Sequence, residues 1–164
     1  MAVKSNTASV VYIVEHALAA LIEGAPQVTG LFNGEDTLSV FCSTDEDFGE
    51  KLKASLNGSL GQCIFVRYGG RNSLEFGPHG LVVENGHVQI DVSSSLLLAG
   101  DKPESAISLA EAVDAAVSGV ALSEPFTRKP CLVNTHSYAY DEYNGRYTAA
   151  ITVNVQFVLG RRDA

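Results

Sequence analysis

Basic residues are scarce in this sequence. Eleven Lys and Arg residues stand against 19 Asp and Glu, which gives a formal net charge of −8. The basic side chains are scattered, with small groups only at Arg128–Lys129 and Arg161–Arg162. Because contacts with nucleic-acid phosphates need clustered Lys and Arg, this balance argues against a role in sequence-specific nucleic-acid binding.

Cysteines are also few, and long apolar runs are missing. The three cysteines, Cys42, Cys63 and Cys131, are widely spaced and odd in number, which does not describe a disulfide framework, so we expect reduced, buried thiols. The longest apolar stretches fall well short of a membrane span, and residues 1–9 lack the apolar centre of a signal peptide. The 164 residues fit one domain, 1–164, in which we expect residues 1–6 and 160–164 to be flexible.

Recognisable motifs for metal, nucleotide or nucleophilic chemistry are absent. No two cysteines are close enough for a zinc knuckle, and ligand spacing is lacking around the four histidines, His16, His79, His87 and His136. Cys131 and His136 lie five residues apart on one predicted strand, so their side chains point to opposite faces. The sequence therefore predicts no catalytic residue, no metal ligand and no cofactor. A metal site assembled from residues distant in the chain stays open.

The clearest pattern that is present lies at the C-terminal end. Apolar and polar residues alternate over residues 146–159, and one face carries Tyr147, Ala149, Ile151, Val153, Val155, Phe157 and Leu159. A period of two over this length predicts a half-buried antiparallel strand. A second run, 131–140, precedes it across a polar, aromatic turn. Together they predict a long C-terminal β-hairpin.

Apolar residues at three- and four-residue spacing predict three helices. The first covers 9–23, with Thr7 or Ser9 as N-cap and Gly24 at its end. The second starts at the acid-rich segment 44–47, where Ser43 or Thr44 can cap it. The third follows residue 101, and Glu124-Pro125 is expected to break it.

Further strands complete the predicted fold. Residues 37–43 and 61–70 read as strands, residues 71–80 read as irregular, and Asn85-Gly86 predicts a hairpin turn inside 81–95. We expect an α+β fold with a central, mainly antiparallel sheet packed against two or three helices, closing with the long C-terminal β-hairpin.

The turn of the last hairpin is rich in tyrosine and charge. We expect a subunit or partner interface there, formed by Tyr138, Tyr140, Asp141, Glu142, Tyr143, Asn144 and Arg146. A cross-strand aromatic ladder that only stabilises the hairpin explains the tyrosines equally well. The sequence leaves both interpretations open.

The order of elements in residues 87–159 resembles the tail terminator proteins of long-tailed bacteriophages. In that family a polar-alternating strand leads into an amphipathic helix, and a two-strand unit closes the chain. The corresponding segments are HVQIDV, KPESAISLAEAVDAAVSGV and HSYAYDEYNGRYTAAITVNVQFVL. The N-terminal helix supports the resemblance, whereas the segment 37–86 is longer than the compact family pattern.

This resemblance implies a non-enzymatic virion protein, assembled in the host cytoplasm. Such a protein caps the tail tube, ends its polymerisation and forms the surface for head attachment. The implied state is a homo-oligomer, a hexameric ring closed by a heterologous interface, with the tail tube protein and the head-completion protein as partners. The alternatives are another head–tail connector or minor tail protein, a small α/β enzyme or ligand-binding module, and a stand-alone bacterial protein.

Overall fold

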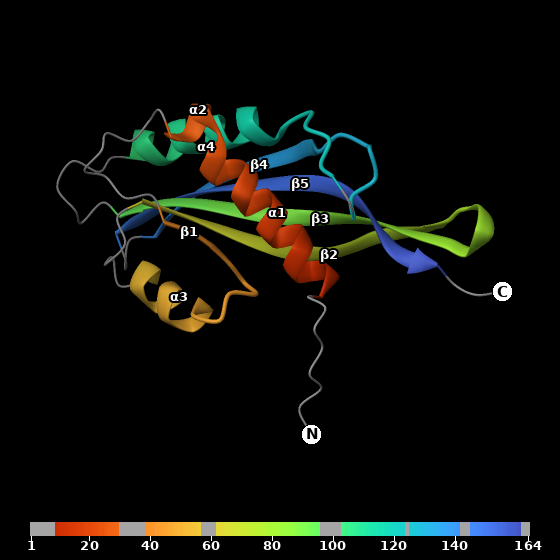
Figure 1. The fold of residues 1–164 in the computed structure, drawn as a ribbon. Helices are drawn as coiled ribbons and strands as arrows, with labels where there is room; N and C mark the ends of the chain where they lie inside the picture. Colours follow the sequence, from red (N-terminus) through yellow and green to blue (C-terminus); the bar gives the residue numbers. More distant parts are fainter. Residues whose placement is uncertain are drawn as a thin grey trace, which may run out of the picture.

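A computed structural model of the chain consists of a five-stranded sheet with helices on both faces (Figure 1). The structure describes residues 9–29, 39–56, 62–95, 103–123, 125–141 and 145–161. The helices are α1 (Val10–Gly24), α2 (Pro26–Thr29), α3 (Phe48–Leu56), α4 (Pro103–Val117) and the short 3-10 helix η1 (Pro78–Gly80). The strands are β1 (Ser39–Cys42), β2 (Gln62–Phe76), β3 (Leu81–Ser95), β4 (Leu132–Asp141) and β5 (Arg146–Arg161).

The strands lie in the order β1-β2-β3-β5-β4. Only β1 and β2 run parallel, and every other neighbouring pair is antiparallel. Helices α1, α2 and α4 lie on one face of the sheet and α3 on the other (Figure 1). The predicted α+β class, the mainly antiparallel sheet and the C-terminal hairpin are confirmed.

The main core lies between the sheet and the layer of α1, α2 and α4. The alternation predicted for the last strand is confirmed, because Ala149, Ile151, Val153, Val155 and Phe157 are buried, whereas Leu159 is exposed. Burial of each large aliphatic or aromatic side chain contributes about 1.5–3 kcal/mol. The neighbouring strand β3 adds Val88, Ile90 and Val92 to the same face. The helices supply the opposing buried side chains, which include Val14, Leu18, Ile22, Val113 and Val117.

Helix boundaries follow local sequence only in part. Ser9 is the N-cap of α1 as predicted, since its side chain accepts a hydrogen bond from the Tyr12 N–H at 3.1 Å. The end of α4 was predicted wrongly: the helix stops at Val117, well before Glu124-Pro125. The chain turns at Gly119, which has a φ of 77° and whose N–H donates to the Cys131 carbonyl at 2.8 Å. The helix therefore ends just before a glycine in the left-handed region, and a long-range backbone contact holds the chain there.

The predicted turn at Asn85-Gly86 is wrong, because β3 runs through both residues without interruption. The 71–80 segment is not irregular throughout either, since β2 continues to Phe76. The two strands turn instead at η1, where His79 has a φ of 59°. At the other end of the sheet, β5 extends to Arg161, so residues 160–161, which were expected to be flexible, pair with β3. Residues 1–6 and 162–164, for which we also expect flexibility, lie outside the described residues.

Position 86 requires a glycine because the side chain of Tyr68 packs against it. A Cβ at this position would overlap the Tyr68 hydroxyl and lie 2.8 Å from Tyr68 Cζ. The ring of Tyr68 needs that space, because its hydroxyl donates to the buried carboxylate of Glu84 on the same face of the sheet.

The substitution Gly86→Ala should destabilise the protein by about 1–3 kcal/mol, since it forces Tyr68 out of its position. Chemical denaturation measured by circular dichroism gives the free energy of unfolding. Gly49→Ala is the matched control. Gly49 lies in α3, and a Cβ added there would have no atom within 4 Å. Equal stability of Gly86→Ala and the unsubstituted protein would contradict the packing role assigned to Gly86.

Candidate functional site

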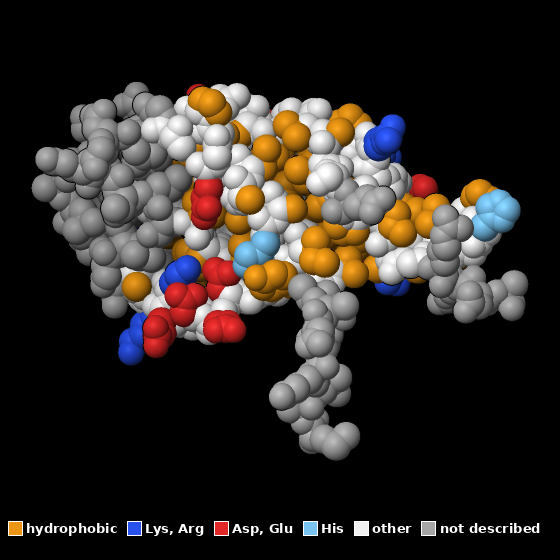
Figure 2. Space-filling model, viewed as in Figure 1, with side chains coloured by type: hydrophobic (Ala, Val, Ile, Leu, Met, Phe, Trp, Pro, Cys, Tyr) orange, Lys and Arg blue, Asp and Glu red, His pale blue; other side chains and the backbone are white. Residues whose placement is uncertain are grey.

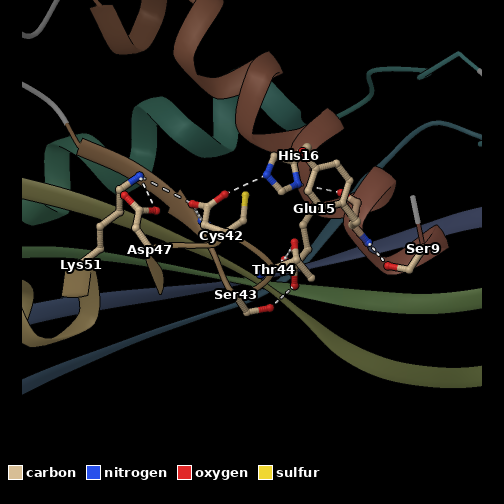
Figure 3. A network of polar contacts seen from close by, with 10 residues as sticks. Ser9, Glu15, His16, Cys42, Ser43, Thr44, Asp47 and Lys51 are labelled. Carbon is tan, nitrogen blue, oxygen red and sulfur yellow. Dashed lines mark hydrogen bonds and ion pairs between the residues drawn. The ribbon is translucent and has the colours of Figure 1, made fainter. Parts of the chain in front are cut away.

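Polar side chains from α1, from β1 and from the turn between β1 and α3 meet in one place (Figure 3). We call this group the α1–β1 cluster; it comprises Glu15, His16, Cys42, Ser43, Thr44 and Asp45. Figure 2 shows acidic and histidine atoms meeting on the surface where α1 approaches α3. The cluster gathers the most varied chemistry in the part of the chain that the structure describes.

Glu15 is the buried centre of the cluster. It is fully buried on α1, and its carboxylate accepts four hydrogen bonds. The donors are the Ser43 hydroxyl at 2.5 Å, the Thr44 N–H at 3.1 Å and the Thr44 hydroxyl at 2.8 Å. The fourth donor is the N–H of Tyr68 at 2.8 Å, where the register of β2 shifts. A buried charge is tolerated only when hydrogen bonds replace its water, and these four replace it.

This arrangement corrects the predicted start of α3. Ser43 and Thr44 were expected to cap that helix, but their side chains donate to Glu15 instead. The helix therefore begins at Phe48, and the acidic residues 45–47 precede it.

Replacing Glu15 with Ala should lower the free energy of unfolding by at least about 2 kcal/mol, because several buried donors lose their acceptor. The matched control is Glu23→Ala, which removes an exposed carboxylate near the end of the same helix. Thermal and urea denaturation of both variants measure the effect. A similar stability for the two variants would show that Glu15 does not hold α1 in place.

His16 is the next residue of α1 and contacts Asp45. Its Nδ1 donates to the Tyr12 carbonyl at 2.8 Å, and its Nε2 lies 2.8 Å from Asp45 Oδ1. The second oxygen of Asp45 accepts the Cys42 N–H at 2.8 Å and lies 3.7 Å from Lys51 Nζ. Burial by itself raises the pKa of Asp45, but these hydrogen bonds and the charges of Lys51 and His16 outweigh it and leave that pKa below its ordinary value.

Cys42 lies beside both residues. Burial first, and then the negative charges of Asp45 and Glu15, raise the pKa of the Cys42 thiol to about 12. Burial also raises the pKa of Cys131. A protonated thiol is a poor nucleophile. All three cysteines are buried and outside any disulfide, as the sequence predicted.

The sequence did not predict that His16, Cys42 and Asp45 come together. Their ligand atoms lie within 4.8 Å of one another. Motif spacing in the sequence could not predict this grouping. His16 lies on α1, whereas Cys42 and Asp45 lie much further along the chain, at the end of β1 and in the turn after it. The available signal was only that His16 follows a glutamate on the apolar face of a predicted helix.

The candidate interface residues of the last hairpin are not all exposed. Tyr138 and Tyr140 are 47% and 55% exposed. Arg146 begins β5 opposite Asp141 but is only 4% exposed. Glu142, Tyr143 and Asn144 lie outside the described residues. Among the side chains of this predicted surface that the structure describes, Tyr138 and Tyr140 are the exposed ones.

Arg146 lies against the sheet face that carries α3. Its Nη2 donates to Ser93 Oγ at 2.5 Å and contacts Cys63 Sγ at 3.3 Å. Both partners are buried. The sequence predicts an exposed Arg146, because this residue follows a charged turn. In the structure, the pairing of β5 with β3 buries its side chain.

Substitution of Arg146 with Ala should cost about 2–4 kcal/mol in the free energy of unfolding, since it leaves a cavity and removes the donor to Ser93. Arg67→Ala is the comparison, because that arginine is exposed on β2. Denaturation curves of the two variants decide the point; an unchanged midpoint for Arg146→Ala would refute the buried role.

Strand β4 forms one edge of the described sheet. It pairs with β5 alone, and every residue from Asn134 to Tyr140 is exposed. Tyr138 stacks against Tyr147 of β5 with ring centroids 6.4 Å apart, so the aromatic ladder considered from the sequence exists for this pair. His136 contacts Asp114 of α4 at 2.9 Å, which ties the strand to the helix layer. An edge strand of this length offers unpaired backbone groups to another chain.

One depression of about 320 Å³ lies elsewhere, between β2, β3 and β5 and the segment before β4. Asn72, Ser73, Asn85 and Gln156 are among its lining residues, and none of those residues is a cysteine or a histidine. The groups with raised pKa values, Cys42, Cys131 and Tyr68, do not line it. This depression therefore gives no support to an enzyme active site. Among the described residues, no helix is long and apolar enough to cross a membrane.

Comparisons with known proteins give a structural likeness without a sequence relative. No protein-family model matches the chain, and no curated protein matches it. Among solved structures, the fold is similar to that of a chain in the virion of a native gene transfer agent particle. The TM-score is 0.60 at 12% sequence identity, and the match covers 92% of this chain and 99% of the other. At that identity the comparison establishes a shared fold, the fold of a virion component.

Proposed function

We propose that this protein is a structural subunit of a phage-like virion, and more narrowly a tail terminator. In that role it caps the tail tube, ends tube polymerisation and provides the surface to which the head attaches. The observation that carries the proposal is the fold match, which spans nearly the whole of both chains. The element order of residues 87–159 supports the narrower role, since it resembles tail terminators independently of that match.

The edge strand β4 supports an assembly role. A ring needs a heterologous interface, in which one surface of a subunit binds a different surface of the next. The exposed β4, with Tyr138 and Tyr140, supplies one such surface: aromatic side chains beside unpaired strand backbone. The net charge of −8 also suits a ring whose channel must let DNA pass without binding it.

A direct test uses the purified protein and a polymerising phage tail tube protein from the same genome. We expect addition of this chain to stop tube elongation, and electron microscopy to show it at one tube end. Light scattering at high concentration should give about six subunits if rings form freely. A strictly monomeric protein that also fails to bind tube ends would refute the terminator role. Binding to heads but not to tubes would favour another head–tail connector.

The double substitution of Tyr138 and Tyr140 with Ser should impair ring formation and tube capping more than folding. Loss of the Tyr138–Tyr147 stacking costs the fold only about 0.5–1.5 kcal/mol, because the two substituted side chains, Tyr138 and Tyr140, are about half exposed already. The control is Tyr12→Ser, which removes another exposed tyrosine, on α1. If the double variant instead loses many degrees of melting temperature and still assembles, the tyrosines serve the fold and not the interface.

A further inference from the structure

The contact between His16 and Asp45 is one that either a hydrogen on Nε2 or a bound metal ion can mediate. The Tyr12 carbonyl can only accept, so Nδ1 of His16 carries a hydrogen. In a neutral ring the lone pair then lies on Nε2, which is 2.8 Å from the carboxylate oxygen Oδ1 of Asp45. Two acceptors this close repel each other unless a proton or a metal ion lies between them.

Cys42 supplies a third ligand atom of the same site. Its Sγ, the His16 ring nitrogen and an Asp45 oxygen all lie within 4.8 Å of one another (Figure 3). Around zinc, with bonds of about 2.0–2.3 Å, tetrahedral ligand atoms lie about 3.2–3.8 Å apart. The widest separation therefore has to close by about 1 Å, whereas His16 Nε2 and Asp45 Oδ1, now 2.8 Å apart, have to move slightly away from each other. The partly exposed His16 ring can make such a movement.

We propose that His16, Cys42 and Asp45 bind a divalent transition-metal ion of the zinc type, with water as the fourth ligand. Nitrogen, sulfur and oxygen together suit Zn²⁺ or Co²⁺, whereas Mg²⁺ and Ca²⁺ prefer oxygen alone. The His16 and Asp45 side chains are 31% and 18% exposed, which leaves a path for the ion and for the water.

The surroundings of the site match this ligand set. The carbonyl of Tyr12 orients the His16 ring from behind, and the Cys42 N–H holds the second oxygen of Asp45. Groups that orient metal ligands in this way are characteristic of protein metal sites. The charges acting on the Cys42 sulfur are mostly negative, since Asp45, Glu15 and Glu23 oppose the single cation Lys51.

Binding of the ion exchanges protons for the metal. The thiol of Cys42 releases its proton to solvent as the metal–sulfur bond forms, and the His16 ring binds the ion through Nε2. Asp45 binds as the carboxylate that it already is. The bound ion would join α1 to β1 and to the turn before α3, so it would stabilise the helix layer against the sheet. This site stands independently of the proposed virion role.

The test is titration of the metal-free full chain, prepared with a chelator, with ZnCl₂ in a calorimeter and with CoCl₂ in a spectrophotometer. We expect one ion per chain, a near-ultraviolet charge-transfer band from a cobalt–thiolate bond, and a higher melting temperature with zinc. His16→Ala and Cys42→Ser should each weaken binding by at least about 10–100-fold, the loss seen even for outer ligand-orienting groups.

Cys131→Ser is the matched control, because that cysteine is also free and buried but lies outside the cluster. It should keep both the affinity and the cobalt–thiolate band. His16→Ala alters a partly exposed side chain, so it remains informative if Cys42→Ser folds poorly. The proposal is overturned if the unsubstituted chain binds no zinc in excess metal, or if both cluster variants bind as tightly as the control.

Discussion

The carboxylate of Glu15 is the contact on which the arrangement of the site depends. It is a fully buried charge, and its four donors come from the turn after β1 and from β2. A buried charge without these donors would cost several kcal/mol, so the helix, the turn and the strand are held in one relative position. That position brings the next residue, His16, against Asp45 and beside Cys42. The same bonds take Ser43 and Thr44 away from α3, which is why that helix starts late.

The sheet divides into a covered part and an open edge. The central strands bury one apolar face, with β3 and β5 under α4 and β2 under α1, and this face supplies much of the hydrophobic core. Strand β4 forms the open edge, where residues 134–140 are exposed, and His136 connects it to the helix layer through Asp114. A protein that leaves a long strand edge uncovered either protects it or uses it for association. The proposed assembly role uses this edge for association.

Sequence patterns succeeded where the structure depends on neighbours in the chain. The alternation of β5 and the apolar spacing of α1 each reflect a single buried face, so both elements could be predicted. Sequence patterns failed where a residue distant in the chain determines the local structure. Asn85-Gly86 has the composition of a turn, yet the glycine is there to make room for Tyr68. Arg146 has the setting of an exposed tip, yet strand pairing places it against Ser93 and Cys63.

The sequence by itself determined the α+β class, the closing hairpin and the buried state of the cysteines, because these depend on local periodicity and composition. The tertiary structure alone decided which polar groups meet. Glu15 and His16 are adjacent on a helix whose partners lie beyond a further segment of the chain, and no spacing rule connects them with Cys42 and Asp45. Only the packing of α1 across β1 and β2 brings these ligand atoms within reach of one ion, since hydrogen bonds and metal coordination act over a few ångströms in space.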